Sequence, residues 1–167
     1  MDTSDVFGPC TFFLLEKLHK LRFDEDIYKK MIHDVKYRLD NFRDSLNEIQ
    51  ITNIELFLIT LDKQIHKILK EIKFSENLIE NDMGDLESDL YLSNFYDIPI
   101  TYPSLKNKQK KYYKKMRLPA LYLEKNKIID NIKNDIINCD ITNYTKNMII
   151  LYHINRYINY IFMKKSN

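Results

Sequence analysis

Three adjacent acids, Asp24, Glu25 and Asp26, are the first residues of this sequence whose type and spacing suggest chemistry. Clustered carboxylates can hold a divalent metal ion or act as acids and bases, and they can also begin a helix. Neighbouring side chains in a helical turn point about 100° apart, so these carboxylates do not converge on one ion without further ligands. We therefore interpret Asp24 as a helix N-cap, with Glu25 and Asp26 in the first turn beside the positive end of the helix dipole.

The cysteines and histidines add no metal-binding or catalytic motif. Cys10 and Cys139 lie far apart, without the paired spacing of a zinc site or a disulfide framework, which favours a reducing compartment. No two histidines form an HxxxH or HExxH pair, and only 2 glycines are present, too few for a phosphate-cradling loop. We expect no metal, no cofactor and no enzymatic activity. The histidines are His19, His33, His66 and His153.

One stretch has binding character, the basic segment "KNKQKKYYKKMR" at residues 106–117. Its lysines could neutralise phosphates while its tyrosines stack on bases. It could equally be a solvated helix or linker that faces acidic groups of a partner, and the net charge of +2 does not by itself indicate a nucleic-acid-binding protein. The candidate contacts to phosphate or to an acidic partner are Lys110, Lys111, Lys114, Lys115 and Arg117.

Apolar residues at steps of three and four predict helices over the first 75 residues. A short helix is expected to start at Gly8-Pro9, and a longer one is expected after Phe23. The short link at residues 47–52 then predicts an antiparallel helical hairpin. The inward side chains expected for the short helix are Phe12, Leu15 and Leu18. Those of the long helix are Ile27, Met31, Val35, Leu39, Phe42 and Leu46. Those of the second long helix are Ile54, Phe57, Leu58, Leu61, Ile65, Ile68 and Ile72.

Charge and proline divide the rest of the chain. Residues 75–105 carry seven acids and no Lys or Arg, and residues 106–117 carry seven bases and no acid. Pro99, Pro103 and Pro119 prevent one continuous helix here, so we expect a basic, proline-flanked linker at 98–119.

The segment after the linker is rich in Ile, Thr and Tyr, which favours short strands, although "IIDNIKNDII" also fits an amphipathic helix. The expected fold is mainly α, with an antiparallel helical bundle at 1–97 followed by a small β-containing module at 120–167. The C-terminal apolar run is interrupted by polar residues, which disfavours a membrane anchor.

The order of these features resembles the GINS family of eukaryotic replication factors. The resemblance begins with "VFGPCTFFLLEKLHKL" and continues with "FDEDI" running into "YKKMIHDVKYRL". The segment "ITNIELFLITLDKQIHKILKEI" is similar to the second long helix of the family. "RLPALYLEKNKIIDNI" and "ITNYTKNMIILYHINRYINYIFMKK" resemble the small C-terminal module.

This resemblance implies a non-catalytic subunit of the GINS heterotetramer, located in the nucleus. The tetramer scaffolds the replicative helicase by joining the MCM ring to its accessory protein of the Cdc-forty-five type in DNA replication. DNA contact is then weak or indirect, and no membrane is involved. We expect the interface with partners to use apolar side chains of the bundle and of the C-terminal module. These are Phe12, Leu15, Phe42, Leu46, Phe57, Leu61, Ile65, Leu121 and Tyr122.

Two other functions fit parts of the sequence. A viral inhibitor of the Bcl-2 type would bind amphipathic helical peptides in a groove, and it needs a nearly all-apolar central helix, for which "IELFLITL" is the candidate. A basic nucleic-acid-binding adaptor would use residues 106–117 and would show steep salt dependence of binding.

Overall fold

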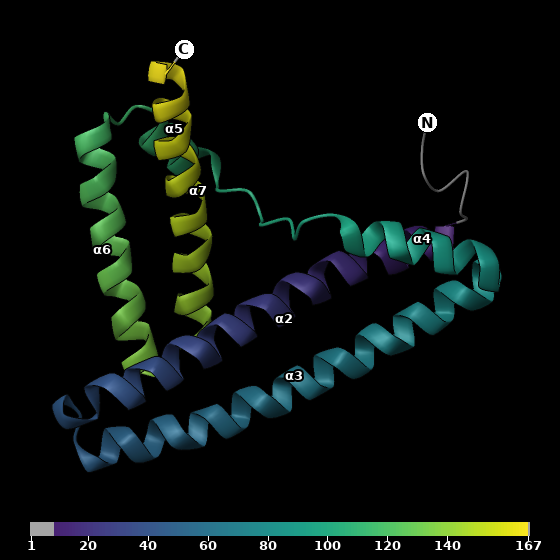
Figure 1. The fold of residues 1–167 in the computed structure, drawn as a ribbon, viewed down its shortest axis with the longest axis horizontal. Coiled ribbons are helices and arrows are strands. Elements are labelled where there is room, and N and C mark those ends of the chain that lie inside the picture. Colours follow the sequence, from purple (N-terminus) through teal and green to yellow (C-terminus); the bar gives the residue numbers. More distant parts are fainter. Residues whose placement is uncertain (1–8, 167) are drawn as a thin grey trace. The chain divides into compact units, whose positions relative to one another are not determined.

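Residues 9–166 are described by a computed structural model, with side chains described from residue 12 to residue 165. Every regular element in this range is helical and none is a strand (Figure 1). The mainly α fold is therefore confirmed. The elements are α2 (Pro9–Phe42), the 3-10 turn η1 (Arg43–Ser45), α3 (Glu48–Met83), α4 (Asp85–Asp97), α5 (Asn107–Lys114), α6 (Leu118–Ile137) and α7 (Ile141–Ser166).

The first helix, α2, is longer than the sequence pattern predicted. The expected short helix and the helix expected after Phe23 form one helix, because no Gly or Pro interrupts residues 10–42. Pro9 is its first residue, a position where the missing N–H of proline costs nothing. Asp24 lies in the middle of this helix, so its interpretation as an N-cap was wrong.

The helical stripes are confirmed in most positions. Of the sixteen side chains expected to point inward, eleven are buried, among them Leu18, Met31 and Ile54 at 0% exposure. Four are half-buried and one is exposed. Phe42 is an exception, because it is the last residue of α2 and is 43% exposed. Leu46 follows η1 and is half-buried.

The chain forms two compact units, and both of them contain parts of α2 and α3. Unit 1 comprises residues 1–32 and 59–101, and unit 2 comprises residues 33–58 and 102–167. This division into compact units does not test the domain boundaries expected near residues 97 and 119. Those boundaries stay predictions.

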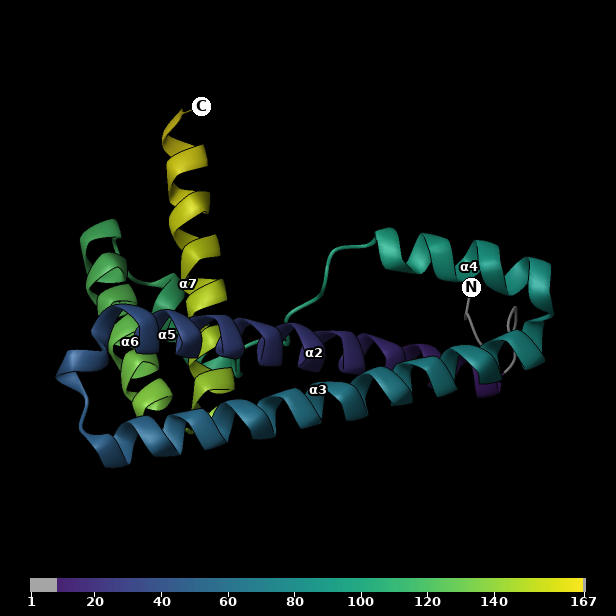
Figure 2. The same cartoon turned by 60° about the horizontal axis from the view of Figure 1, so that its bottom comes forward.

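In unit 1, the first part of α2 and the later part of α3 share a core with α4, which reverses direction after α3 (Figure 2). Arg22 stabilises the C-terminal end of α4, because its guanidinium donates hydrogen bonds to the carbonyl oxygens of Phe95 and Ile98, both at 3.2 Å. The guanidinium carbon also lies 5.1 Å from the centre of the Phe95 ring. The core consists of Leu15, Leu18, Leu21, Ile68, Ile72, Ile79, Leu92 and Phe95.

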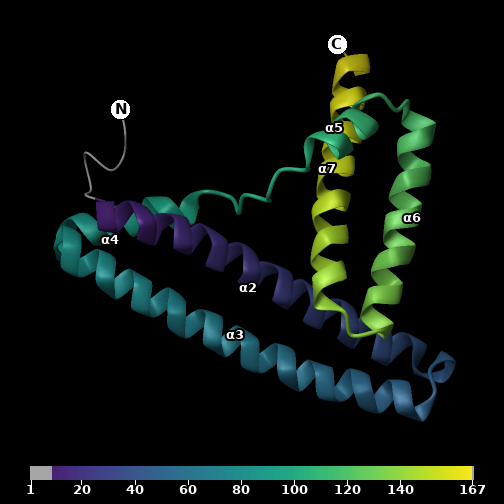
Figure 3. The ribbon, with the colours of Figure 1, turned by 180° about the vertical axis from the view of Figure 1, so that it is seen from behind.

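In unit 2, α6 and α7 pack along one another, and α5 contacts α7 (Figure 3). Tyr144 of α7 is fully buried, and its hydroxyl donates a hydrogen bond to Asp34 Oδ2 at 2.7 Å. At the turn between α6 and α7, the Cys139 thiol lies 3.8 Å from the carbonyl oxygen of Asn53. These contacts connect the C-terminal helices to the parts of α2 and α3 that belong to unit 2.

The expected β-containing module at 120–167 was wrong, because its described residues form α6 and α7. Ile128, Ile132 and Ile136 are buried at steps of four, which is the helical pattern that "IIDNIKNDII" also allowed. Pro119 lies in the first turn of α6, where it is compatible with a helix. Asp140 accepts a hydrogen bond from the Asn143 backbone N–H at 3.1 Å, and so caps α7.

The proline-containing connection at residues 98–106 has no helix, whereas α5 lies inside the basic part of the expected linker. Tyr113 of α5 and Leu105 just before it are both buried, so this segment is packed in unit 2. None of the described helices is long and apolar enough to cross a membrane.

Candidate interaction surfaces

The acidic cluster on α2 is engaged in ion pairs within the helix. Glu25 pairs with Lys29 at 2.6 Å, and Asp26 pairs with Lys30 at 2.9 Å, both at i,i+4 spacing. Burial raises the pKa of Asp24, and nearby Lys20 opposes that shift. Within the described residues, no group of three or more His, Cys, Asp or Glu side chains is placed to hold a metal ion.

Two of the histidines have specific packing roles. The His19 ring lies edge-on to the Phe95 ring at 4.4 Å between centroids, and burial, followed by the charge of Arg22, lowers the pKa of His19. His153 is buried in unit 2, and its Nε2 donates a hydrogen bond to the carbonyl oxygen of Pro103 at 2.7 Å. These contacts position the C-terminal end of α4 and the segment before α5. The remaining histidines, His33 and His66, are exposed.

A concentration of positive charge occupies one end of unit 2. We name as the basic end residues 106–127 and 151–165, which comprise α5, the first part of α6 and the last part of α7. Figures 1 and 3 show α5 and the start of α6 beside the C-terminal half of α7, and Figure 2 shows the last turns of α7 extending beyond them. The basic end contains twelve Lys and Arg residues and a single acid, Glu124. The bases are Lys106, Lys108, Lys110, Lys111, Lys114, Lys115, Arg117, Lys125, Lys127, Arg156, Lys164 and Lys165.

Lysines of α5, together with Lys115 directly after its end, form an exposed face. Tyr113 is only 6% exposed, so its side of α5 is the buried one. Lys108, Lys111 and Lys115 lie on the opposite side, within about 60° of one another around the helix. All three are exposed. Two of the predicted contacts, Lys111 and Lys115, are thus on this face. Of the others, Lys114 and Arg117 are exposed, and Lys110 is half-buried.

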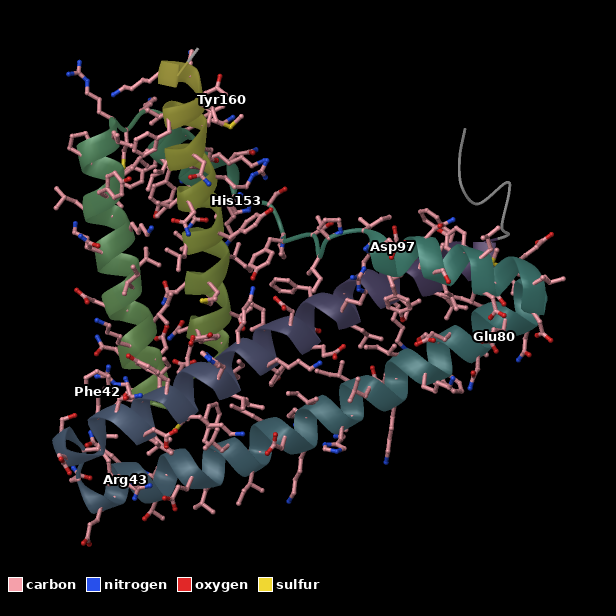
Figure 4. All side chains as sticks on the ribbon, in the orientation of Figure 1. Phe42, Arg43, Glu80, Asp97, His153 and Tyr160 are labelled. Carbon is pink, nitrogen blue, oxygen red and sulfur yellow. The ribbon has the colours of Figure 1, made fainter. Side chains whose placement is uncertain are left out.

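Exposed tyrosines lie among these cations. Tyr112 is 54% exposed on α5, Tyr122 is 40% exposed on α6, and Tyr160 is 62% exposed on α7. Figure 4 labels Tyr160 near the C-terminal end of α7, and the Lys164 Nζ lies 5.8 Å from the centre of its ring. The sequence does not predict a role for Tyr160, because its helix contributes to the basic end only once α6 and α7 are paired.

The one acid of the basic end does not neutralise it. The Glu124 carboxylate lies 3.5 Å from the Lys127 ammonium group and accepts a 3.5 Å hydrogen bond from the Tyr112 hydroxyl. The other acids of α6 and its following turn, Asp130, Asp135 and Asp140, lie beyond this part of the chain. Glu124 can offset only one of the twelve bases, so the two segments of the basic end keep an excess of eleven positive charges.

A second surface lies on α4 in unit 1. Leu86 and Leu90 are 88% and 68% exposed, and their i,i+4 spacing places them next to each other on one helix face. We name this pair the α4 ridge. The opposite face of α4 is buried through Ser88, Leu92 and Phe95. Three acids flank the ridge, namely Asp85, Glu87 and Asp89.

The side chains expected at a partner interface are divided by burial. Leu15, Leu61, Ile65 and Leu121 are buried in the chain itself, and Phe12, Leu46 and Phe57 are half-buried. Phe42 and Tyr122, at 43% and 40% exposure, are the two that are accessible. The α4 ridge was missed because apolar residues occur on both faces of α4, and the sequence does not tell which face is covered.

No family model matches the chain, and no curated protein or solved structure matches it at a significant level.

Proposed function

We propose that this chain is a non-catalytic helical scaffold that binds another protein through the α4 ridge. The observation that carries the proposal is the pair Leu86 and Leu90, the first of them 88% exposed, on a helix whose other face is fixed in the core of unit 1. Exposed apolar patches mark protein–protein contacts, and these two adjacent leucines, 88% and 68% exposed, form such a patch. The acids beside the ridge favour a partner helix that combines apolar and basic residues.

Within this proposal, the order of sequence features favours a GINS subunit, closest to the partner-of-Sld-five type. Such a subunit would act in the nucleus, where the complex scaffolds the MCM helicase and its accessory protein. The long helices α2 and α3 support this assignment. The helical C-terminal half does not, because the resemblance implied a β-containing module there.

The decisive experiment is co-expression of the tagged chain with the three other GINS subunits of the same genome. We expect one complex of fixed stoichiometry in gel filtration. Leu90→Glu should weaken its assembly at least tenfold, because a buried, unpaired carboxylate at an interface is costly. Leu123→Glu is the matched control, since Leu123 of α6 is 66% exposed and lies in unit 2.

Two results would separate the parts of the proposal. If no GINS subunit associates but another protein binds in a manner that Leu90→Glu abolishes and Leu123→Glu preserves, the scaffold role stands and the GINS assignment fails. If both variants behave as the unaltered chain does with every partner, the role of the α4 ridge is wrong.

A further inference from the structure

We propose that the basic end of unit 2 binds single-stranded nucleic acid. This inference goes beyond the scaffold role and uses a different surface. It rests on the charge of that end, on the arrangement of lysines on α5, and on the exposed tyrosines that lie among them.

The charge argument is electrostatic. Lys and Arg side chains that replace counterions along a phosphate backbone gain free energy from counterion release. The basic end gathers segments that are far apart in sequence, residues 106–127 and 151–165, and the single acid within these segments, Glu124, is already in contact with Lys127. Positive charge concentrated over one end of a unit is typical of proteins that bind polyanions. The net charge of the whole chain is only +2, because acids elsewhere in the sequence offset this concentration.

The helix α5 supplies the row of contacts. At about 1.5 Å rise per residue, Lys108 and Lys115 are separated by about 10 Å along the helix, with Lys111 between them. The buried Tyr113 on the opposite face holds this helix against the rest of unit 2. The three lysines therefore lie in a row on one exposed face, suited to successive phosphates of a strand.

The tyrosines favour a single strand over a duplex. Tyr112, Tyr122 and Tyr160 are between 40% and 62% exposed, so their rings can stack on bases. Bases of a duplex are already stacked and do not present their faces. Lysine-rich contacts to phosphate do not read sequence, so we expect binding with little base preference.

An anionic membrane fits the surface less well. A helix that lies in a membrane interface needs a wide apolar face, and α5 has the sequence "NKQKKYYK", which contains no aliphatic residue. An acidic protein could pair with the lysines and arginines of the basic end, but it would offer no bases to stack on the tyrosine rings. Both are outcomes that the experiment distinguishes.

The test measures fluorescence anisotropy of labelled oligothymidine of about 30 nucleotides with the full chain, at several salt concentrations. The variant K108Q/K111Q/K115Q should bind at least tenfold more weakly. Its log–log salt dependence should be less steep by about 2, because each lost phosphate contact contributes about 0.7 on a single strand. The matched control is K63Q/K67Q/K70Q, which removes three exposed lysines from one face of α3 and should bind as the unaltered chain does.

A second variant, Tyr160→Leu, tests stacking separately from charge. It should weaken binding of the single strand about tenfold and leave the salt dependence unchanged. Circular dichroism and thermal unfolding of all variants establish that the fold is kept, which is expected because every altered side chain is exposed.

Parallel titrations use a duplex of the same length, phosphatidylserine vesicles and polyglutamate. The proposal is overturned if both lysine triples lose affinity equally, since only net charge would then matter. It is also overturned if the duplex, the vesicles or polyglutamate bind as tightly as the single strand, or if Tyr160→Leu has no effect.

Discussion

The hydrogen bond between Tyr144 and Asp34 joins α7 to α2 within unit 2. Tyr144 is fully buried, and its hydroxyl lies 2.7 Å from Asp34 Oδ2. A hydrogen bond to a charged group contributes about 1.5–3 kcal/mol when it is desolvated, and less when the acceptor is partly solvated, as the Asp34 side chain is at 38% exposure.

We predict that Tyr144→Phe lowers the free energy of unfolding by about 1–2 kcal/mol, because it removes this bond and keeps the ring. Urea denaturation followed by circular dichroism measures the change. Tyr160→Phe is the control, since the Tyr160 side chain is 62% exposed and should lose less than about 0.5 kcal/mol. Equal effects of the two substitutions would show that the bond to Asp34 does not stabilise unit 2.

Asp135 gives unit 2 a pH dependence. Its side chain is 8% exposed and accepts a hydrogen bond from Asn147 Nδ2 at 2.7 Å. Burial raises the pKa of Asp135, the bond from Asn147 opposes this shift, and the charge of Asp140 adds to it. The folded state therefore holds the Asp135 proton more tightly than the unfolded state does.

The sign follows from this difference. As pH rises from the ordinary Asp pKa of about 3.9 through the raised pKa of Asp135, ionisation costs more in the folded state, so this residue's contribution to stability falls. In Asp135→Asn, the new amide oxygen can still accept the hydrogen bond from Asn147. We predict that this variant's free energy of unfolding, relative to that of the unaltered chain, is higher at pH 7 than at pH 3. Urea midpoints at both pH values measure this. A difference independent of pH would contradict the prediction.

At the scale of elements, the reversal from α3 to α4 depends on Gly84. Its φ of 87° and ψ of 158° lie in a region that only glycine adopts readily, and no heavy atom lies within 4 Å of an added Cβ. A substitution here is consequently strained through the backbone and not through a clash.

We predict that Gly84→Ala destabilises unit 1 by about 1–3 kcal/mol. Hydrogen exchange followed by mass spectrometry should show faster exchange in peptides from α4 and the later part of α3, with less change in α6 and α7. Asn81→Ala is a control, since Asn81 is an exposed residue inside α3. Unchanged exchange in Gly84→Ala would mean that α4 does not need this turn.

The elements differ in how far the sequence could predict them. Spacing of three and four predicted α2 and α3 because each has one continuous apolar stripe, as in Ile27, Met31 and Val35. The same spacing is present in α6, but its many isoleucines favour strands by intrinsic propensity. Intrinsic β propensity is weak beside the burial of one helical face, and here the packing of α6 on α7 prevails.

The candidate surfaces were predictable in part, for a physical reason. The lysines of 106–117 are adjacent in sequence, so their concentration could be seen without a structure. Tyr160 and Lys164 join them only through the pairing of α6 with α7, which is a tertiary property. Exposure of Leu86 and Leu90 likewise depends on which face of α4 the core of unit 1 covers.

At the scale of the whole molecule, the longest acidic run and the longest basic run of the sequence lie in different units. All seven acids between residues 75 and 105 lie in unit 1, and the seven bases of 106–117 lie in unit 2. Each unit therefore has its own surface chemistry, apolar and acidic on α4 and basic and aromatic on α5.

We predict that the isolated chain self-associates as its concentration rises, because the α4 ridge displays two leucines. The double variant Leu86→Glu/Leu90→Glu should increase the fraction of monomer in sedimentation velocity. Leu123→Glu should increase it less. A chain that stays monomeric without substitution would contradict this prediction.

The passage of α2 and α3 through both units limits how the protein can be divided. A fragment that ends at residue 101 would keep all of unit 1, but its residues 33–58 would lose the contacts of Asp34 with Tyr144 and of Asn53 with Cys139. Unit 1 is therefore to be isolated as a shortened hairpin, in which a brief turn joins residue 32 to residue 59, and not as a simple N-terminal fragment.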